Sequence, residues 1–382
     1  MNKCIYSEVC GGCKYQGVSY KKQLEIKNAL IDSLLSAFSK PKPILGMKDP
    51  SSYRNKVQVT FGKDDNNQII YGNYVENSHV IVPIKTCAIC DQDAMCIIQT
   101  IYNLIKKYKI SVFNEHTYRG CLRHVLIRTN HNNEHMVVLV TGLMRFPKCN
   151  LFINDLLKKH KNIKTIIQCI NEKRTSSILG NKSYVLYGDG YLQDKLCGNL
   201  YNLGYNSFYQ INKIMTKILY NTAIDYANLK DCDVVLDAYC GIGTISLALA
   251  KKCKKVVGVE INKNAVKDAI INKKINNISN AYFIAEDATK YMLNDNKEKF
   301  DVVFVDPPRS GCDNRFLKAL LKINPKTIVY ISCNPYTLKN DLGFLCKNNQ
   351  YKVNNIQPVD MFPYTEHVEC IVLLSKHGLW VY

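Results

Sequence analysis

The C-terminal part of the chain repeats one pattern, in which a short apolar run alternates with a segment of helix length. From about residue 231 the apolar runs cover 232–241, 255–262, 281–287, 300–308 and 327–333. Helix-length segments lie between them at 243–253, 263–277 and 314–324. Such alternation predicts an α/β fold with a mostly parallel, doubly wound sheet. Two final runs, at 351–362 and 368–376, lack an intervening helix and predict a terminal antiparallel hairpin.

Before residue 205 the pattern changes to short strands separated by Gly and Asn turns. These strands are expected to be mostly antiparallel, and helices at 21–38 and 93–108 interrupt them. We therefore expect two domains, an N-terminal α+β region over 1–205 and an α/β domain over 206–382.

The chain is strongly basic, with 51 Lys and Arg against 32 Asp and Glu and a formal net charge of +19. A lysine-rich composition alone could produce this excess, but a polyanionic partner, most simply a nucleic acid, also explains it. No apolar run approaches the ~18 residues of a membrane span, and the N-terminus lacks the apolar core of a signal peptide. We expect a cytoplasmic protein without membrane association, in which clustered cysteines indicate a metal or catalysis.

Four acidic residues lie where the expected strands end: Asp237, Glu260, Asp287 and Asp306. The carboxyl ends of parallel strands meet at one edge of the sheet, where open α/β sheets bind ligands. Gly241 opens the helix after the first strand, so its backbone can approach a ligand closely. No third glycine completes a dinucleotide motif, which favours an adenosyl ligand without a pyrophosphate. Glu260 is placed to bind ribose and Asp287 to meet adenine; a solvated rim of carboxylates is the alternative.

The stretch TIVYISCNP, residues 327–335, ends an apolar strand with a thiol. A cysteine inside such a strand would be an ordinary small hydrophobe. Cys333 instead comes at the carboxyl end, followed by Asn334 and Pro335, which is where such sheets place their chemistry. Cys333 is therefore a candidate reactive residue.

A second cysteine pattern lies near the N-terminus. Cys4, Cys10 and Cys13 have the spacing C-x5-C-x2-C, with two glycines in the turn. Three thiols so spaced can bind one metal centre, and a fourth ligand must come from elsewhere. Cys87 and Cys90 are the candidates, and four thiolates suit zinc as well as an iron–sulfur cluster.

Five motifs follow one another in the C-terminal half: DAYCGIGTISL, GVEI, DPPRSG, YISCNP and MFPYTEHVE. Together they resemble the RNA uracil-5 methyltransferases that use S-adenosylmethionine. The resemblance implies a Rossmann-like class I methyltransferase domain. It identifies Cys333 as the nucleophile that adds to C6 of uracil and Glu369 as the base that removes the C5 proton. Glu366 is a neighbouring carboxylate that competes for the second role.

The resemblance also assigns ligands. Gln210, in the segment FYQIN, and Tyr239 match positions through which the family contacts S-adenosylmethionine, and the strand-end acids and Gly241 complete that site. A 4Fe–4S cluster is implied as well, with Cys90 as an extra thiol. Its four expected ligands are Cys4, Cys10, Cys13 and Cys87.

The expected partner is RNA, with a uridine of 23S rRNA as the target and the T-loop uridine of tRNA as the alternative. Many relatives carry a small β-barrel RNA-binding domain, the TRAM domain, before the cysteine cluster. The cluster here starts at Cys4, so we expect the barrel to be absent. The segment YRNK at 53–56 matches the RNA-binding side of the family. No obligate protein partner is evident in the sequence.

Two other functions fit parts of the sequence. DPPR is similar to the loop of amino-methyltransferases, but the aromatic residue that stacks on their target base is missing after Pro308. A non-catalytic iron–sulfur RNA-binding protein would leave Cys333, Glu369 and the strand-end acids unexplained.

Overall fold

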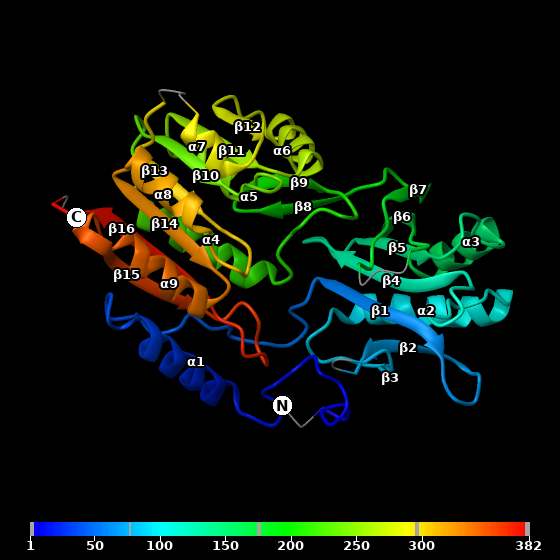
Figure 1. Ribbon diagram of the computed structural model, residues 1–382. Helices are drawn as coiled ribbons and strands as arrows, with labels where there is room; N and C mark the ends of the chain where they lie inside the picture. The colour runs from blue at the N-terminus through cyan, green and yellow to red at the C-terminus, as the bar shows by residue number, and fades with distance from the viewer. Residues whose placement is uncertain (1–3, 76–77, 174–176, 295–297, 379–382) are drawn as a thin grey trace. The chain divides into compact units, whose positions relative to one another are not determined.

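The computed structural model describes residues 4–75, 78–173, 177–294 and 298–378 and divides the chain into two compact units (Figure 1). Unit 1 contains residues 1–17, 49–194 and 202–211, and unit 2 contains 18–48, 195–201 and 212–382. The sequence predicted one boundary, between 1–205 and 206–382. The structure divides the chain differently because residues 18–48 pack with the C-terminal sheet.

Unit 1 is built on one mixed sheet with the strand order β3-β2-β1-β4-β5-β6-β7 among the described residues. The strands pair antiparallel, as predicted, except that β5 and β6 are parallel. Apolar residues of α2 and α3 share one core with this sheet. Its elements are β1 (Lys56–Lys63), β2 (Ile69–Tyr74), β3 (Ile81–Pro83), α2 (Gln92–Tyr108), β4 (Leu122–Thr129), β5 (His135–Thr141), α3 (Cys149–Lys159), β6 (Ile163–Ile170) and β7 (Lys182–Tyr187). A ribbon of β8 (Leu192–Leu196) and β9 (Asn199–Leu203) contains residues of both units.

Unit 2 contains the predicted α/β sheet, with the order β12-β11-β10-β13-β14-β16-β15. The first five strands are parallel, and β16 runs antiparallel to both β14 and β15. This confirms the mostly parallel sheet and the terminal hairpin. The strands are β10 (Val234–Ala238), β11 (Lys255–Glu260), β12 (Ala281–Ala285), β13 (Val302–Val305), β14 (Thr327–Ser332), β15 (Tyr351–Val359) and β16 (Glu369–Lys376).

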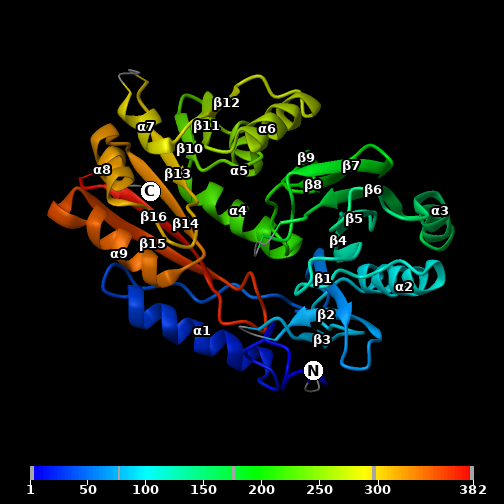
Figure 2. The ribbon, with the colours of Figure 1, turned by 45° about the vertical axis from the view of Figure 1, so that its right-hand side comes forward.

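Helices cover both faces of this sheet (Figures 1 and 2). One face buries apolar residues of α1, α7, α8 and α9 in a single core with the strands. The helices of unit 2 are α1 (Tyr20–Leu35), α4 (Lys213–Ala227), α5 (Thr244–Leu249), α6 (Lys263–Ile275), α7 (Ala288–Leu293), α8 (Asn314–Ile323), α9 (Pro335–Leu345) and the short η1 (Lys347–Asn349). In the part of the chain that the structure describes, no helix has the length and apolar character needed to cross a membrane.

A buried ion pair explains why α1 belongs to unit 2. The Lys27 ammonium lies 2.6 Å from the Asp360 carboxylate, and neither side chain is exposed. Tyr20 donates a hydrogen bond to the second Asp360 oxygen at 2.8 Å, and the Gln23 side chain accepts one from the Tyr364 backbone at 2.9 Å. Helix α1 therefore holds the loop between β15 and β16.

Replacement of Lys27 by methionine should destabilise the fold strongly. The Asp360 carboxylate would stay buried without its cation, and loss of one partner of a buried pair costs about 3–5 kcal/mol. Urea unfolding of the full chain would measure this loss. Lys22→Met is the matched control, because Lys22 on the same helix pairs with Glu25 at the surface, and such pairs contribute little. Equal stability of the two variants would contradict the argument.

Candidate active site

The carboxyl ends of four parallel strands bring the predicted residues to one edge of unit 2. Along the sheet, Glu260 ends β11, Asp237 lies near the end of β10, Asp306 follows β13 and Cys333 follows β14. These strands are neighbours in that order, so their ends form a continuous row. The predicted clustering at the sheet edge is therefore present.

Asp237 is a buried carboxylate with an incomplete set of partners. Its side chain is 1% exposed, and one oxygen accepts a short hydrogen bond from the Ser246 hydroxyl. The other oxygen is buried and has no hydrogen-bond partner among the described residues. Burial, together with the charges of Asp306 and Glu260, raises the pKa of Asp237 to about 7, and the Ser246 hydrogen bond opposes that rise. A ligand that brings a hydrogen-bond donor or a positive charge would relieve this cost.

The loop after β10 leaves its backbone open. Gly241 has a φ of 54°, and a Cβ atom there would meet nothing within 4 Å. Gly243 differs, because a Cβ atom would come 2.8 Å from the Phe283 ring. Tyr239 has a φ of 66°, which is uncommon for a non-glycine residue, and its ring packs 5.2 Å from that of Phe316. The loop therefore offers an accessible backbone at Gly241 beside a fixed aromatic side chain.

Two of the other three acids, Glu260 and Asp287, have local hydrogen bonds. Glu260 accepts from the Gly241 backbone at 3.2 Å and from the Asn262 backbone at 2.8 Å. Asp287 lies two residues beyond the end of β12 and caps α7, accepting from the Lys290 backbone at 3.0 Å. The sequence placed Asp287 at the end of a strand. That position is corrected here, because the strand ends earlier and the carboxylate starts a helix.

Gln210 belongs to unit 1, unlike the other predicted cofactor ligands. Its backbone carbonyl accepts a hydrogen bond from the Asn55 side chain at 3.2 Å. Phe208, two residues earlier, is 74% exposed, which is unusual for a large aromatic side chain. The role of Gln210 stays a prediction.

Cys333 and Glu369 meet through the register of two antiparallel strands. The β14–β16 ladder ends at the pair Ser332 and Cys370, which are the chain neighbours of Cys333 and Glu369. The charge of Glu369 also acts on the Cys333 thiol and raises its pKa. Glu369 is 3% exposed, whereas Glu366 is exposed in the preceding turn. The geometry therefore brings Glu369 to the thiol.

Both groups are held in their neutral forms by burial. Burial raises the pKa of Cys333 to about 11, and the nearby charges of Glu369 and Asp306 add to the rise. Burial likewise raises the pKa of Glu369 to about 8, with a further contribution from Asp306. Arg309 acts in the opposite direction on both groups. At neutral pH the thiol is protonated and the carboxyl group is mostly protonated.

Residues that the sequence analysis did not select hold the two reactive loops together. The Asn334 side chain donates a hydrogen bond to the Arg309 carbonyl at 3.0 Å, which ties the cysteine loop to the DPPR loop. Asp341 in α9 accepts from the Cys312 backbone at 2.9 Å and from the Tyr330 hydroxyl at 2.5 Å. An asparagine at the start of a helix was a signal for the first contact. Nothing in the sequence pointed to the second.

The N-terminal thiols gather in unit 1. Burial raises the pKa of Cys13 to about 11, Arg54 opposes that rise, and the neighbouring thiols Cys87, Cys10 and Cys4 add to it. These four predicted ligands therefore lie within electrostatic range of one another.

The contacts among these thiols leave the predicted cluster unconfirmed. Cys87 and Cys90 share a side-chain hydrogen bond, which lowers the pKa of Cys87 to about 6 and raises that of Cys90. In the described part of the chain, no three Cys, His, Asp or Glu residues are arranged to hold a metal ion. The four thiols have the right donor chemistry for the cluster, which stays a prediction.

Comparison with known proteins assigns the family. Residues 19–377 match the tRNA (uracil-5-)-methyltransferase family. The chain belongs to this family. An uncharacterized RNA methyltransferase of Oceanobacillus iheyensis is 41% identical over 375 residues, covering 96% of this chain and 81% of that protein. One of Staphylococcus aureus strain MSSA476 is 40% identical and covers 97% and 83%.

A solved structure of the same family supports the fold. Pyrococcus abyssi tRNA (uracil-54, C5)-methyltransferase in complex with S-adenosyl-L-homocysteine is 28% identical, with a TM-score of 0.80 over 96% of this chain and 86% of that chain. The chain is thus an RNA uracil-5 methyltransferase that uses S-adenosylmethionine. The unpartnered Asp237 oxygen and the open backbone at Gly241 fit such a ligand. This assignment leaves the amino-methyltransferase and non-catalytic alternatives without support.

Replacement of Glu369 by glutamine should speed alkylation of Cys333 by iodoacetamide at pH 9. Above its pKa of about 8 the Glu369 carboxylate is charged and raises the pKa of the thiol. Its removal lowers that pKa, and each unit of decrease gives about tenfold more reactive thiolate. Mass spectrometry of the Cys333 peptide follows the rate. Glu366→Gln is the control and should leave it unchanged; an unchanged rate in Glu369→Gln would mean that the two groups do not interact.

Proposed function

We propose that this methyltransferase modifies C5 of a uridine in 23S rRNA through a covalent bond between Cys333 and C6, with Glu369 as the base. The observation that carries the proposal is the end of the β14–β16 ladder, which lies next in the chain to both the thiol and a buried carboxylate. The base that removes the C5 proton must lie close to the nucleophile, because C5 and C6 are adjacent atoms of one ring. Glu366 is exposed and lies outside this ladder.

The residues of this chain would act in a fixed order. Bound S-adenosylmethionine supplies a methyl group on a positively charged sulfur. Cys333 would give its proton to water and add to C6 as the thiolate, which moves electron density to C5 and the O4 oxygen. C5 would then form a bond to the methyl carbon while the methyl–sulfur bond breaks and its electrons stay on the sulfur. Arg309 favours the thiolate, since its charge lowers the pKa of Cys333. After C5 carries the methyl group, the Glu369 carboxylate accepts the C5 proton, the S–C6 bond breaks and the thiolate is restored.

The cofactor site would combine the strand-end acids with the glycine loop. Asp237 offers its unpartnered oxygen, and Gly241 offers an approachable backbone. Glu260, at the end of β11, is placed for the ribose, as acids at this position are in related folds. The remaining proposed contacts follow from the family resemblance, and they are Gln210, Tyr239, Asp287 and Asp306.

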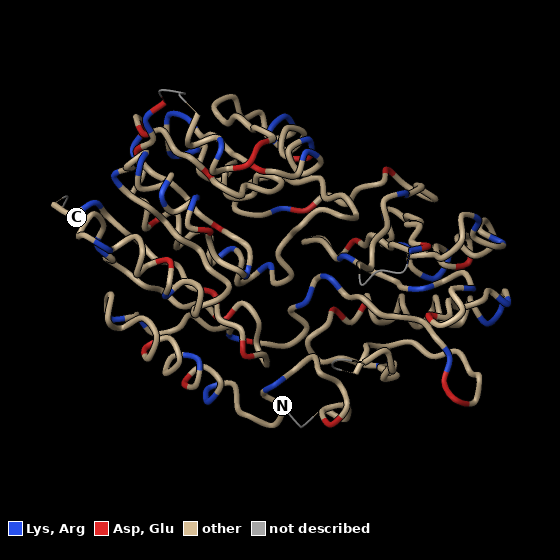
Figure 3. The backbone as a smooth tube through the Cα atoms, in the orientation of Figure 1, with Lys and Arg blue, Asp and Glu red and all other residues tan. Residues whose placement is uncertain are grey.

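The RNA target has two candidates. The family resemblance favours 23S rRNA, and the net charge of +19, with Lys and Arg on both units, suits any RNA (Figure 3). The T-loop uridine of tRNA is the second candidate, because the structurally similar Pyrococcus abyssi enzyme acts on uracil-54 of tRNA by its description. Incubation of unmodified 23S rRNA and tRNA transcripts with S-adenosylmethionine, followed by nucleoside analysis, would separate the two.

Glu369→Gln should accumulate protein bound covalently to methylated RNA. The nucleophile can still add and C5 can still be methylated, but without the base the C5 proton stays and the thiolate is not expelled. Denaturing gel electrophoresis with labelled 23S rRNA and tRNA transcripts would detect the complex.

Two matched variants make this result specific. Cys333→Ala combined with Glu369→Gln should abolish the complex, because no bond to C6 can form. Glu366→Gln should turn over without accumulating it. A complex that persists without Cys333, or that forms with Glu366→Gln, would refute the assignment.

We also propose that Cys4, Cys10, Cys13 and Cys87 bind a 4Fe–4S cluster with a structural role. The support is the family resemblance and the proximity of the four thiols in unit 1. Such a cluster would join the N-terminal segment to a residue some seventy positions along the chain, and closure of a long loop restricts the unfolded state.

Protein purified without oxygen should be brown and contain about four iron and four sulfide per chain. Cys87→Ser should lose the visible absorption and part of its thermal stability, because one of four ligands is gone. Cys90→Ser should keep both, since Cys90 is the extra thiol. Stoichiometric zinc without iron, or loss of colour only in Cys90→Ser, would contradict the ligand set.

A further inference from the structure

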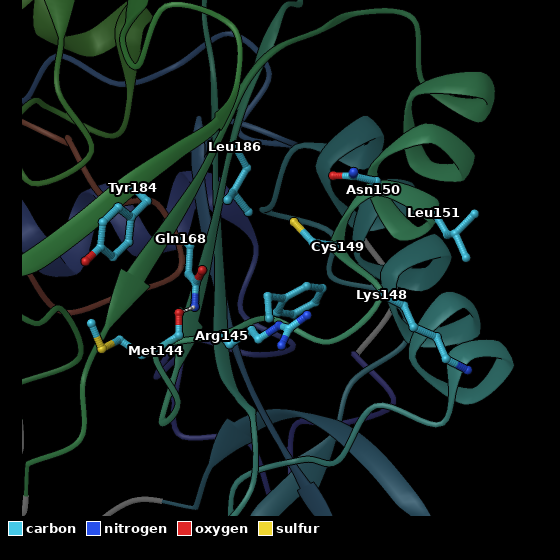
Figure 4. A pocket seen from close by; sticks show the side chains of 10 residues that line it. Met144, Arg145, Lys148, Cys149, Asn150, Leu151, Gln168, Tyr184 and Leu186 are labelled. Carbon is cyan, nitrogen blue, oxygen red and sulfur yellow. Dashed lines mark hydrogen bonds between the residues drawn. The ribbon is translucent and has the colours of Figure 1, made fainter.

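Unit 1 contains a cavity of about 740 Å³ that has no part in the site described above (Figure 4). Its walls come from the segment before α3, the first residues of α3, and the strands β6 and β7. Strand β7 is the edge strand of the sheet, so this cavity opens beside an exposed border. The volume falls within the range of pockets that hold small organic groups.

One wall presents apolar and aromatic surface to solvent. Tyr184 on β7 is 47% exposed and pairs across the sheet with Gln168, so both side chains lie on the same face. Met144 is also exposed, at 59%. In Figure 4, Gln168 lies between Met144 and the start of α3. Exposed apolar side chains that gather around a cavity mark a binding site more often than single ones do.

Hydrogen bonds from Gln168 hold the loop that carries Met144. Gln168 is only 3% exposed, and its amide nitrogen donates to the Thr141 hydroxyl at 2.8 Å and to the Leu143 and Met144 carbonyls at 3.0 and 3.2 Å. Several hydrogen bonds from one buried amide fix the loop before any ligand arrives. The cavity is therefore largely preformed, which reduces the entropic cost of binding.

The cavity also favours negative charge. The described lining residues include the exposed Arg145 and Lys148 and no carboxylate. Helix α3 starts at Cys149 without a side-chain cap, so backbone N–H groups of its first turn face this end. Figure 4 shows Cys149 directed toward Gln168 and Lys148 directed away from it. Arg145 and Lys148 are thus the cations that line the cavity.

We propose that this cavity binds one unpaired nucleotide of the RNA substrate, outside the uridine that is methylated. The base would lie against Tyr184 and Met144, and a phosphate would lie near Arg145 and the start of α3. Aromatic stacking combined with a backbone-binding cation is the chemistry by which proteins hold single-stranded RNA. A purely apolar ligand would make no favourable contact with the positive charges that line the cavity. The proposal rests on the proposed RNA substrate and adds a recognition site to it.

The test compares variants of the full chain that differ in one wall of the cavity. The probe is whichever transcript, 23S rRNA or tRNA, the unaltered enzyme methylates. Tyr184→Ala should raise the Kd for this RNA and the KM by roughly tenfold, the usual effect of losing one stacked base. The kcat at saturating RNA and the affinity for S-adenosylmethionine should not change. Tyr184→Phe should restore tight binding, because it keeps the ring.

The chain supplies matched controls. Val185→Ala removes an apolar side chain of similar exposure, 54%, from the opposite face of β7, where Val185 pairs with Ile167, and it should bind RNA normally. Arg145→Gln should weaken binding and lower the salt dependence by about one ion. Lys159→Gln removes the same charge from the exposed last turn of α3, outside the lining of the cavity, and should have a smaller effect on affinity.

Normal RNA binding by Tyr184→Ala, or equal losses in Tyr184→Ala and Val185→Ala, would overturn the proposal. Equal losses in Arg145→Gln and Lys159→Gln would also do so, because they would indicate unspecific attraction. Failure of the proposed catalytic function would look different. The unaltered enzyme would then form no 5-methyluridine, or Cys333→Ala would keep its activity, whatever the cavity variants do.

Discussion

The reversed direction of β16 is the constraint on which the candidate site depends. In a sheet of parallel strands, only the carboxyl ends of the strands lie at the edge where ligands bind. Cys333 lies at this edge because it follows the last residue of β14. Because β16 runs the other way, it brings its first residue, Glu369, to that edge. A shift of one residue in this ladder would turn Glu369 to the opposite face of the sheet. The positions of Cys333 and Glu369 therefore depend on one register.

Helix α1 protects that register from a distance in the sequence. The chain enters β16 through the loop that the buried pair of Lys27 and Asp360 anchors, with the Tyr364 backbone held by Gln23. A buried ion pair adds little net stability compared with an apolar contact, but it specifies geometry because each charge requires its partner. The pair thus serves position more than stability. This also explains why a helix early in the sequence belongs to the later unit.

The sequence correctly predicted the elements that follow from local periodicity. It did not predict which unit an element joins when contacts with residues far along the chain determine this. The parallel strands, the terminal hairpin and the row of Asp237, Glu260 and Asp306 followed from apolar runs and their ends. The assignment of α1 did not, because a buried helix face does not reveal its partner. Gln23 and Lys27, spaced with Ile31 and Leu35 on that face, were the available signal. The arrangement of the predicted metal ligands depends on how the chain brings Cys87 to Cys4, Cys10 and Cys13, and the spacing of cysteines in the sequence does not reveal that arrangement.

Electrostatic repulsion among buried acids couples Asp237 and Asp306 to Glu369. Asp306 raises the pKa of both Asp237 and Glu369, so the acids of this edge oppose each other's ionisation. A positively charged ligand at the edge would favour the ionised forms and lower these pKa values. For Glu369, with a pKa of about 8, a modest decrease would move the group from mostly protonated to mostly ionised at neutral pH. The same burial that keeps the resting carboxyl group neutral would thus make its basicity depend on occupancy of the neighbouring site.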